Sequence, residues 1–129
     1  MSDKLLDELG ELQRDVIELI WELGEATVHQ VRDEIRRKKK LAYTTVLSTL
    51  QNLEKSGWLK HRSEGRTYVY MPTRTREEAG GKSLKKFMDS IYDGNALLMF
   101  RHLMQQSKLS DNDLKELRKI IDDMRKEGK

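Results

Sequence analysis

Small hydrogen-bonding side chains recur at helical spacing between residues 42 and 55, on a face that carries few charges. They are Thr44, Thr45, Ser48, Gln51 and Asn52, with Leu47 among them. An ordinary solvent-facing stripe would carry more Glu and Lys. Hydroxyl and amide groups can hydrogen-bond base edges in the major groove of DNA, and an apolar side chain can touch the thymine methyl group. The pattern therefore predicts base contacts by Thr44, Thr45, Leu47, Ser48 and Gln51.

Cations flank this stripe on both sides in the sequence. The net charge is only +3, but residues 32–76 hold twelve basic and four acidic residues, whereas residues 1–31 hold two and eight. Local charge, rather than the total, determines which surface binds a polyanion. A basic run alone is more often a solvated face, but here it adjoins the uncharged stripe. The residues predicted to neutralise DNA phosphates without reading sequence are Lys38, Lys39, Lys40, Arg62 and Arg66.

The elements that must position these residues follow from periodicity and turn signals. Apolar spacing predicts a helix over residues 11–23, a second that starts at the capping-box pattern of Thr27 and Gln30, and a third that ends before Gly57. Residues 58–62 and 67–71 read as two strands of a hairpin around Gly65, with Tyr68, Val69 and Tyr70 as its packing surface. Three helices followed by a basic hairpin predict a mainly α fold with a small β-hairpin wing, the winged helix-turn-helix.

Three further helices are expected after this domain. They begin after Thr75, at residue 95 and at Ser110, which divides the chain into a winged-helix domain (1–74) and a helical dimerisation domain (75–129). Three short helices form a marginal core alone, so we expect a homodimer. A helical hairpin that folds back on its own winged-helix domain is the alternative. The side chains expected at the dimer contact are Leu84, Phe87, Ile91, Leu103, Leu114, Leu117, Ile121 and Met124.

No catalytic constellation is evident in the sequence. The chain has no cysteine, and its three histidines, His29, His61 and His102, lie far apart without metal-ligand spacing. No glycine-rich phosphate loop or nucleophile elbow occurs. We therefore expect a DNA-binding protein that is not an enzyme and needs no metal or cofactor. The N-terminus lacks a secretion signal and no run is long and apolar enough for a membrane span, so a cytoplasmic protein without membrane insertion is expected.

The sequence resembles the penicillinase-repressor family (BlaI, MecI, CopY). The resemblance rests on residues 9–13, Val16 to Trp21, the segment Leu41-Ala42-Tyr43-Thr44-Thr45-Val46 and Gly57-Trp58, and it continues through residues 86–94 and 109–121. It implies a homodimer that binds a palindromic operator in double-stranded DNA and represses resistance, stress or metal-homeostasis genes.

The resemblance also suggests how repression would be relieved. In the β-lactam-responsive branch a membrane sensor protease cuts an Asn-Phe bond in the fifth helix, and the matching bond here joins Met99 to Phe100. The phenylalanine is kept and the asparagine is not. The copper-responsive branch carries a cysteine-rich site in its C-terminal region, which this sequence lacks.

Two other binding classes stay open on sequence grounds. Winged helices also serve as protein-interaction modules that do not touch DNA, and such binding would depend little on salt. A binder of RNA or single strands needs exposed aromatic rings for stacking. The chain's candidates, Tyr43, Trp58, Tyr68 and Tyr70, are all expected in the core, which disfavours that class.

Overall fold

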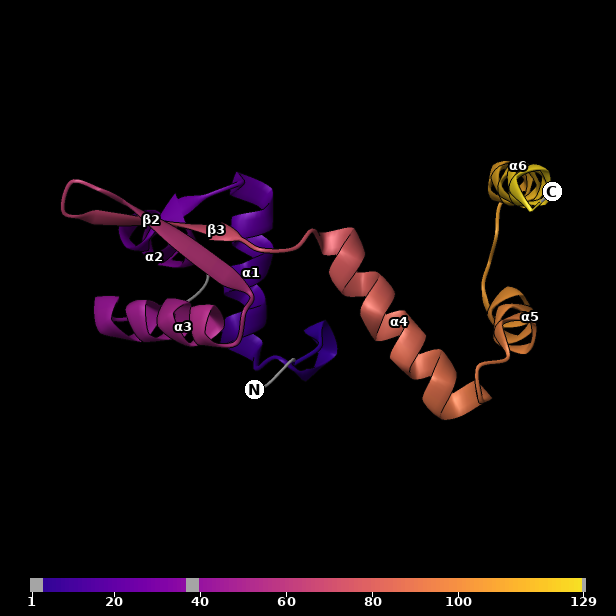
Figure 1. Ribbon diagram of the computed structural model, residues 1–129, viewed down its shortest axis with the longest axis horizontal. Coiled ribbons are helices and arrows are strands. Elements are labelled where there is room, and N and C mark those ends of the chain that lie inside the picture. Colours follow the sequence, from indigo (N-terminus) through magenta and orange to yellow (C-terminus); the bar gives the residue numbers. More distant parts are fainter. Residues whose placement is uncertain (1–3, 37–39, 129) are drawn as a thin grey trace. The chain divides into compact units, whose positions relative to one another are not determined.

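The computed structural model of the chain describes residues 4–36 and 40–128, and it divides into two compact units, residues 1–86 and 87–129 (Figure 1). Each unit is described by itself. The boundary predicted after residue 74 falls between the last strand and the fourth helix.

The N-terminal unit has the element order of a winged helix, which confirms the predicted fold class. The unit begins with a short 3₁₀ turn, η1 (Leu6–Glu8), and ends with the first part of α4. Between these two lie α1 (Glu11–Leu23), β1 (Ala26–Thr27), α2 (Val28–Arg36), α3 (Tyr43–Lys55), β2 (Leu59–Glu64) and β3 (Thr67–Pro72). The helices agree with the predicted ranges because capping groups mark their ends. Thr27 and Gln30, for example, exchange the two hydrogen bonds of a capping box at 2.8 and 3.2 Å.

Three antiparallel strands in the order β1-β3-β2 form the sheet. Strand β1 was not predicted, since two residues carry no periodicity and pair only with the distant β3, Ala26 opposite Tyr70. Strand β2 runs farther toward the turn than predicted, to Glu64, whereas β3 begins at Thr67 as predicted, which leaves Gly65 and Arg66 as a two-residue turn. Gly65 has φ 62°, the positive value that a type II′ turn needs at its first central position.

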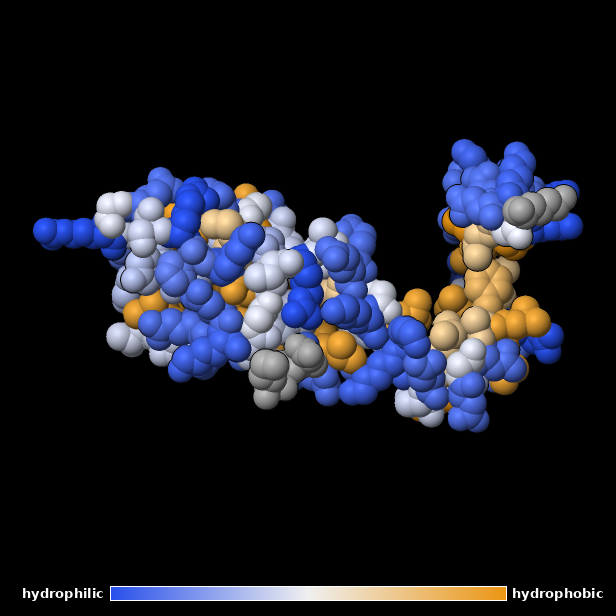
Figure 2. Space-filling view, viewed as in Figure 1, coloured by the Kyte–Doolittle hydropathy of each residue, from blue (hydrophilic) through white to orange (hydrophobic). Residues whose placement is uncertain are grey.

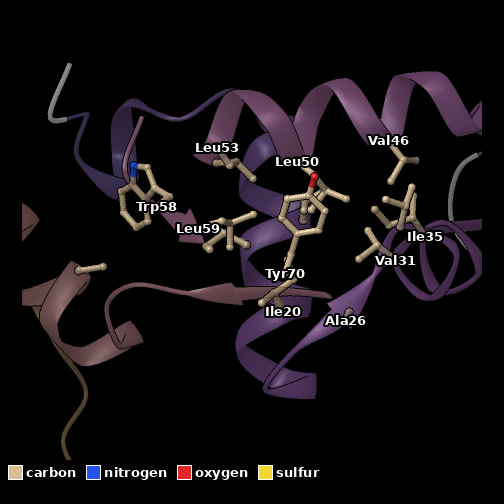
Figure 3. Packing of buried hydrophobic residues seen from close by; sticks show 14 of the residues in the cluster. Ile20, Ala26, Val31, Ile35, Val46, Leu50, Leu53, Trp58, Leu59 and Tyr70 are labelled. Atoms are coloured by element: carbon tan, nitrogen blue, oxygen red, sulfur yellow. The ribbon is translucent and has the colours of Figure 1, made fainter. Parts of the chain in front are cut away.

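One apolar cluster joins the helices to the sheet (Figure 3). Val46, Leu50 and Leu53 of α3 are fully buried, and Figure 3 shows the Tyr70 ring extending from β3 toward Leu50. Burying an aliphatic side chain of this size stabilises the fold by about 1.5–3 kcal/mol. The core therefore fixes which face of α3 points inward, and by exclusion which face points to solvent.

The prediction that Tyr68 is buried in the core is wrong. Tyr68 is 48% exposed, whereas Tyr70 is 1% exposed. Residues two apart in a strand share a face, but Tyr68 lies nearer the turn, beyond the apolar cluster. The prediction treated Tyr68, Val69 and Tyr70 as one packing surface and overlooked both the alternation of faces and the projection of the wing.

Helix α4 (Arg76–Tyr92) begins on the N-terminal unit. Thr75 and Glu78 form the predicted capping box, with bonds of 2.9 and 3.0 Å, and the helix continues through Gly80-Gly81. Ala79 is buried in the core cluster. The Ser83 hydroxyl donates to Asp7 at 2.8 Å and lowers the pKa of that carboxyl. These contacts hold the first part of α4 against the core cluster and η1.

The C-terminal unit consists of the end of α4, α5 (Ala96–Gln106) and α6 (Asp111–Glu127). Asn95 and Ser110 cap the two later helices through their side chains at 3.0 Å each. Neither helix contains a buried residue, although both carry large apolar side chains. Figure 2 shows apolar side chains gathered over α5, whereas the visible surface of α6 is largely hydrophilic. As one chain, this unit has an apolar face without a core.

No helix within residues 4–36 and 40–128 is both long and apolar enough to cross a membrane.

Candidate nucleic-acid interface

The predicted base-reading face of α3 is exposed, because the opposite face fills the core. Thr44, Thr45, Ser48 and Gln51 are exposed, and Leu47 is half-buried where it packs against the core cluster. Thr49, which faces inward, satisfies its hydroxyl by donating to the Thr45 carbonyl at 2.8 Å. The structure thus brings the five predicted residues onto the outer side of one helix.

The predicted cations are placed unequally. Lys40 is exposed shortly before α3, and Arg66 is exposed in the wing turn. Within the part of the chain that the structure describes, Arg66 has no ion pair with a carboxylate. Lys38 and Lys39 lie outside the described residues. Lys40 and Arg66 are therefore the predicted phosphate contacts whose charge the structure shows to be available.

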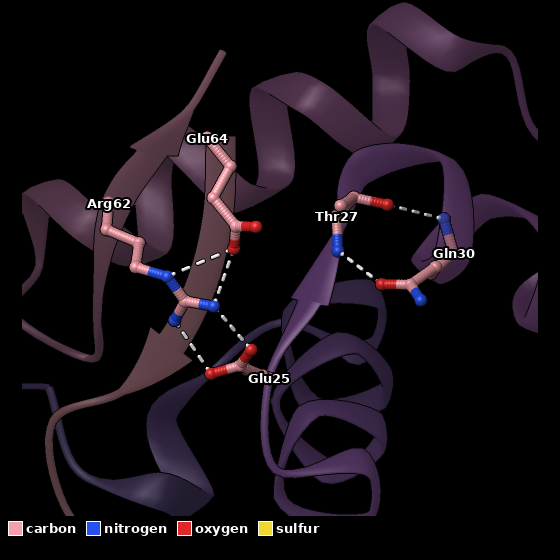
Figure 4. A network of polar contacts seen from close by, with 5 residues as sticks. All are labelled: Glu25, Thr27, Gln30, Arg62 and Glu64. Carbon is pink, nitrogen blue, oxygen red and sulfur yellow. Dashed lines mark hydrogen bonds and ion pairs between the residues drawn. The ribbon is translucent and has the colours of Figure 1, made fainter. Parts of the chain in front are cut away.

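Arg62, in contrast, is held by two carboxylates (Figure 4). Its guanidinium donates to both oxygens of Glu25 at 2.8 and 2.7 Å, and to Glu64 at 3.1 and 2.7 Å. Hydrogen bonds from Arg62 lower the pKa of Glu25. Two negative charges thus surround one positive charge, so a phosphate could recruit Arg62 only by displacing these partners.

The wing hairpin presents two different faces. Arg62 lies opposite Val69, which lies opposite Thr27, so these three residues occupy one row across the sheet. Arg62 and Glu64 therefore share one face. The neighbouring residues, including His61 and Tyr68, occupy the other face. That face is directed toward α3, as the core side chain Tyr70 shows.

A contact on the α3-facing side joins the wing to α3. His61 Nδ1 lies 2.8 and 2.7 Å from the two carboxylate oxygens of Glu54. The His61 ring stacks on Tyr68 with centroids 4.2 Å apart and planes at 24°. Sequence reasoning missed Glu54 and Tyr68 as members of this surface. The only available signal was the two-residue alternation, which places His61, Tyr68 and Tyr70 on one face.

Titratable side chains do not form a metal site in the described residues: no group of three or more His, Asp or Glu there is arranged to hold an ion.

The expected cleavage bond between Met99 and Phe100 lies inside α5, where Met99 is half-buried and Phe100 is 36% exposed.

Comparisons with known proteins agree with this geometry. Residues 9–123 match the model of the family described as "Penicillinase repressor". The "Penicillinase repressor" of Bacillus licheniformis is 23% identical over 120 residues, which span 93% of this chain and 94% of that protein. The "Transcriptional regulator BlaI" of Mycobacterium tuberculosis is 36% identical over 74 residues, 57% of this chain and 54% of that protein. The solved DNA-binding domain of the repressor BlaI matches with a TM-score of 0.51 at 25% identity, over 58% of this chain and 92% of that domain.

Proposed function

The chain belongs to the penicillinase repressor family, and we propose that it represses transcription by binding a palindromic operator in duplex DNA as a homodimer. The observation that carries the proposal is the outer face of α3, an exposed and mostly uncharged stripe with free cations at its flanks. Relatives of the chain are named as repressors and as a transcriptional regulator, and one solved relative is a DNA-binding domain. In this reading α3 enters the major groove and the wing lies along the flanking backbone.

Sequence would be read by the side chains on the outer face of α3. Thr44, Thr45, Ser48 and Gln51 offer hydroxyl and amide groups for base edges, and Leu47 offers a methyl contact to thymine. Lys40 and Arg66 would bind phosphates at the two flanks and set the register of the helix in the groove. Lys38 and Lys39 would add to the first flank, and Arg62 would contribute only after exchanging its carboxylates.

The homodimer is proposed from the state of the C-terminal unit. Leu103, Leu114, Ile121 and Met124 are 56%, 45%, 48% and 64% exposed in the single chain. Burial of each such side chain would stabilise the assembly by about 1.5–3 kcal/mol. This favours association with the same face of a second copy of the chain. Two-fold symmetry would then place two recognition helices on two half-sites of a palindrome.

Cleavage between Met99 and Phe100 by a membrane sensor protease belongs to this proposal as a means of relieving repression. It is supported by the position of the bond in α5, within the segment proposed to hold the dimer. Because α5 is helical, its backbone would have to unwind before a protease could bind it in an extended form.

Ser48→Ala tests base reading. We expect it to change the preference for one base pair of each half-site by about 1–3 kcal/mol, because one hydroxyl contact to a base edge is lost. Duplexes selected from a random-sequence library with the wild-type and the variant chain would be compared by sequencing. The same preferred sequence at the same discrimination for both chains would rule out Ser48 as a reading residue.

Arg66→Ala tests phosphate binding. We expect weaker binding to every duplex and a log–log salt slope less steep by about two units for the homodimer, because one fewer counterion is released at each of its two protomers. Affinity would be measured by fluorescence anisotropy over a series of salt concentrations. Arg62→Ala is the matched control from the same hairpin. Its slope should change less than that of Arg66→Ala, because Glu25 and Glu64 already compensate its charge. Equal slope changes would show that Arg62 contacts phosphate as predicted from the sequence.

A further inference from the structure

Tyr68 is an exposed aromatic residue that the proposed contacts leave without a role. Its side chain is 48% exposed, and it lies in β3 next to the wing turn. Among the described residues, its hydroxyl group has no hydrogen-bond partner, although three other polar groups of the wing, on Arg62, His61 and Glu64, all have one. The Tyr68 ring thus packs against the wing, while its hydroxyl group is available to a partner outside the chain.

The support comes from the recognition helix. Tyr68 stacks on His61, and His61 is bound by both oxygens of Glu54 near the end of α3. At about 100° per residue, Glu54 lies on the same side of α3 as Leu47, at the edge of the reading stripe. The contacts from Tyr68 to His61 and from His61 to Glu54 therefore fix the Tyr68 ring beside the exposed stripe of α3, on the face of the wing that is directed toward α3.

We propose that Tyr68 binds the DNA backbone, its hydroxyl donating to a phosphate oxygen that flanks the base pairs read by α3. Glu54 and His61 act as positioning residues that hold the ring at a fixed distance from the recognition helix. The assignment rests on the proposed function. Backbone hydrogen bonds from tyrosine hydroxyls fix register without carrying sequence information. The surface that binds DNA then extends from α3 over one face of the wing, while the face that carries Arg62 and its carboxylates is turned away.

A phosphate contact by a phenol has a signature that differs from that of Arg66. Tyr68→Phe removes only the hydroxyl and keeps the stack on His61. We expect about two- to tenfold weaker binding for each protomer that contacts the DNA, by the same factor on a duplex selected with the full chain and on an unrelated duplex. The salt slope should stay at the wild-type value, because a neutral donor releases no counterion.

Thr67→Val is the matched control. It removes one neutral hydroxyl from the adjacent position of β3, which points to the opposite face of the hairpin, and it should bind DNA as tightly as the wild type. If Tyr68→Phe binds as tightly as the wild type, or weakens binding no more than Thr67→Val does, the phosphate contact by Tyr68 is refuted and the proposed function is not. Absence of duplex binding by the wild-type chain would overturn the proposed function with it.

The positioning role is tested by a double-mutant cycle. His61→Ala should weaken binding when Tyr68 is present and should have a smaller effect in the Tyr68→Phe background, because the hydroxyl that His61 positions is then gone. Thermal unfolding of each variant measures stability separately. If His61→Ala weakens DNA binding by the same factor in the wild-type and the Tyr68→Phe backgrounds, the positioning role is refuted. A purely structural His61 would give that result.

Discussion

Ile121→Asp should convert the chain from a dimer to a monomer and weaken binding to a palindromic duplex by at least about 100-fold. Ile121 lies in α6 and is 48% exposed in the single chain, on the face that carries Leu114 and Met124. A two-fold interface contains the substitution twice, so two buried side chains at about 1.5–3 kcal/mol each are lost and two carboxylates are introduced. Every 1.4 kcal/mol is tenfold in affinity.

The matched control for this variant is Lys119→Asp. It introduces the same carboxylate at an exposed position of α6 that is roughly opposite the apolar face at about 100° per residue. Mass in solution, measured by light scattering, should be twice the chain mass of 15.2 kDa for the wild type and the control, and 15.2 kDa for Ile121→Asp. A wild-type chain that is monomeric at micromolar concentration would contradict the dimer proposal. So would an Ile121→Asp variant that stays dimeric.

Leu50→Ala should destabilise the winged-helix unit by about 2–5 kcal/mol. Leu50 is fully buried in the cluster that also holds Tyr70, whose ring extends toward it in Figure 3. Truncation leaves a cavity that the packed neighbours can close only in part. A loss of this size is a large fraction of the 5–15 kcal/mol that stabilise a typical domain, and DNA binding should fall at temperatures where the variant unfolds.

Leu23→Ala is the control for core packing. It makes the same truncation at the end of α1, where the side chain is 45% exposed, and the change in unfolding free energy should stay within about 0.5 kcal/mol. Urea denaturation followed by circular dichroism measures both variants. Similar losses for the two truncations would contradict the central position of Leu50 in the core.

Much of the fold could be predicted because its signals are local. Capping boxes at Thr27 and Thr75 mark helix starts, and Gly57, with φ 83°, lies just beyond the end of α3. The apolar face of α3 predicted which residues would be buried, and therefore which would form the exposed stripe. Gly80-Gly81 was a weak spot in the pattern, yet α4 continues through it because its neighbours make caps and tertiary contacts.

The parts that could not be predicted depend on pairings between distant segments. Arg62 finds Glu25, 37 positions earlier, only because β1 is brought beside β3. Strand β1 itself is too short to leave a pattern. The exposure of Tyr68 depends on how far the hairpin projects beyond the core, which residue type alone does not reveal. The exposure of the α3 stripe could therefore be predicted from the sequence, whereas the ion pairs and the exposure of side chains in the wing could not.

The affinity of the full wild-type chain for duplex DNA as a function of salt concentration tests the central claim most directly. Arg66 and Lys40 of two protomers would give four phosphate contacts, so we expect a log–log slope of about −4 or steeper on both a selected and an unrelated duplex. The selected duplex should bind at least about 10³-fold more tightly. An affinity that barely changes with salt, with no preference between the two duplexes, would contradict a surface built for DNA and would indicate a protein partner instead.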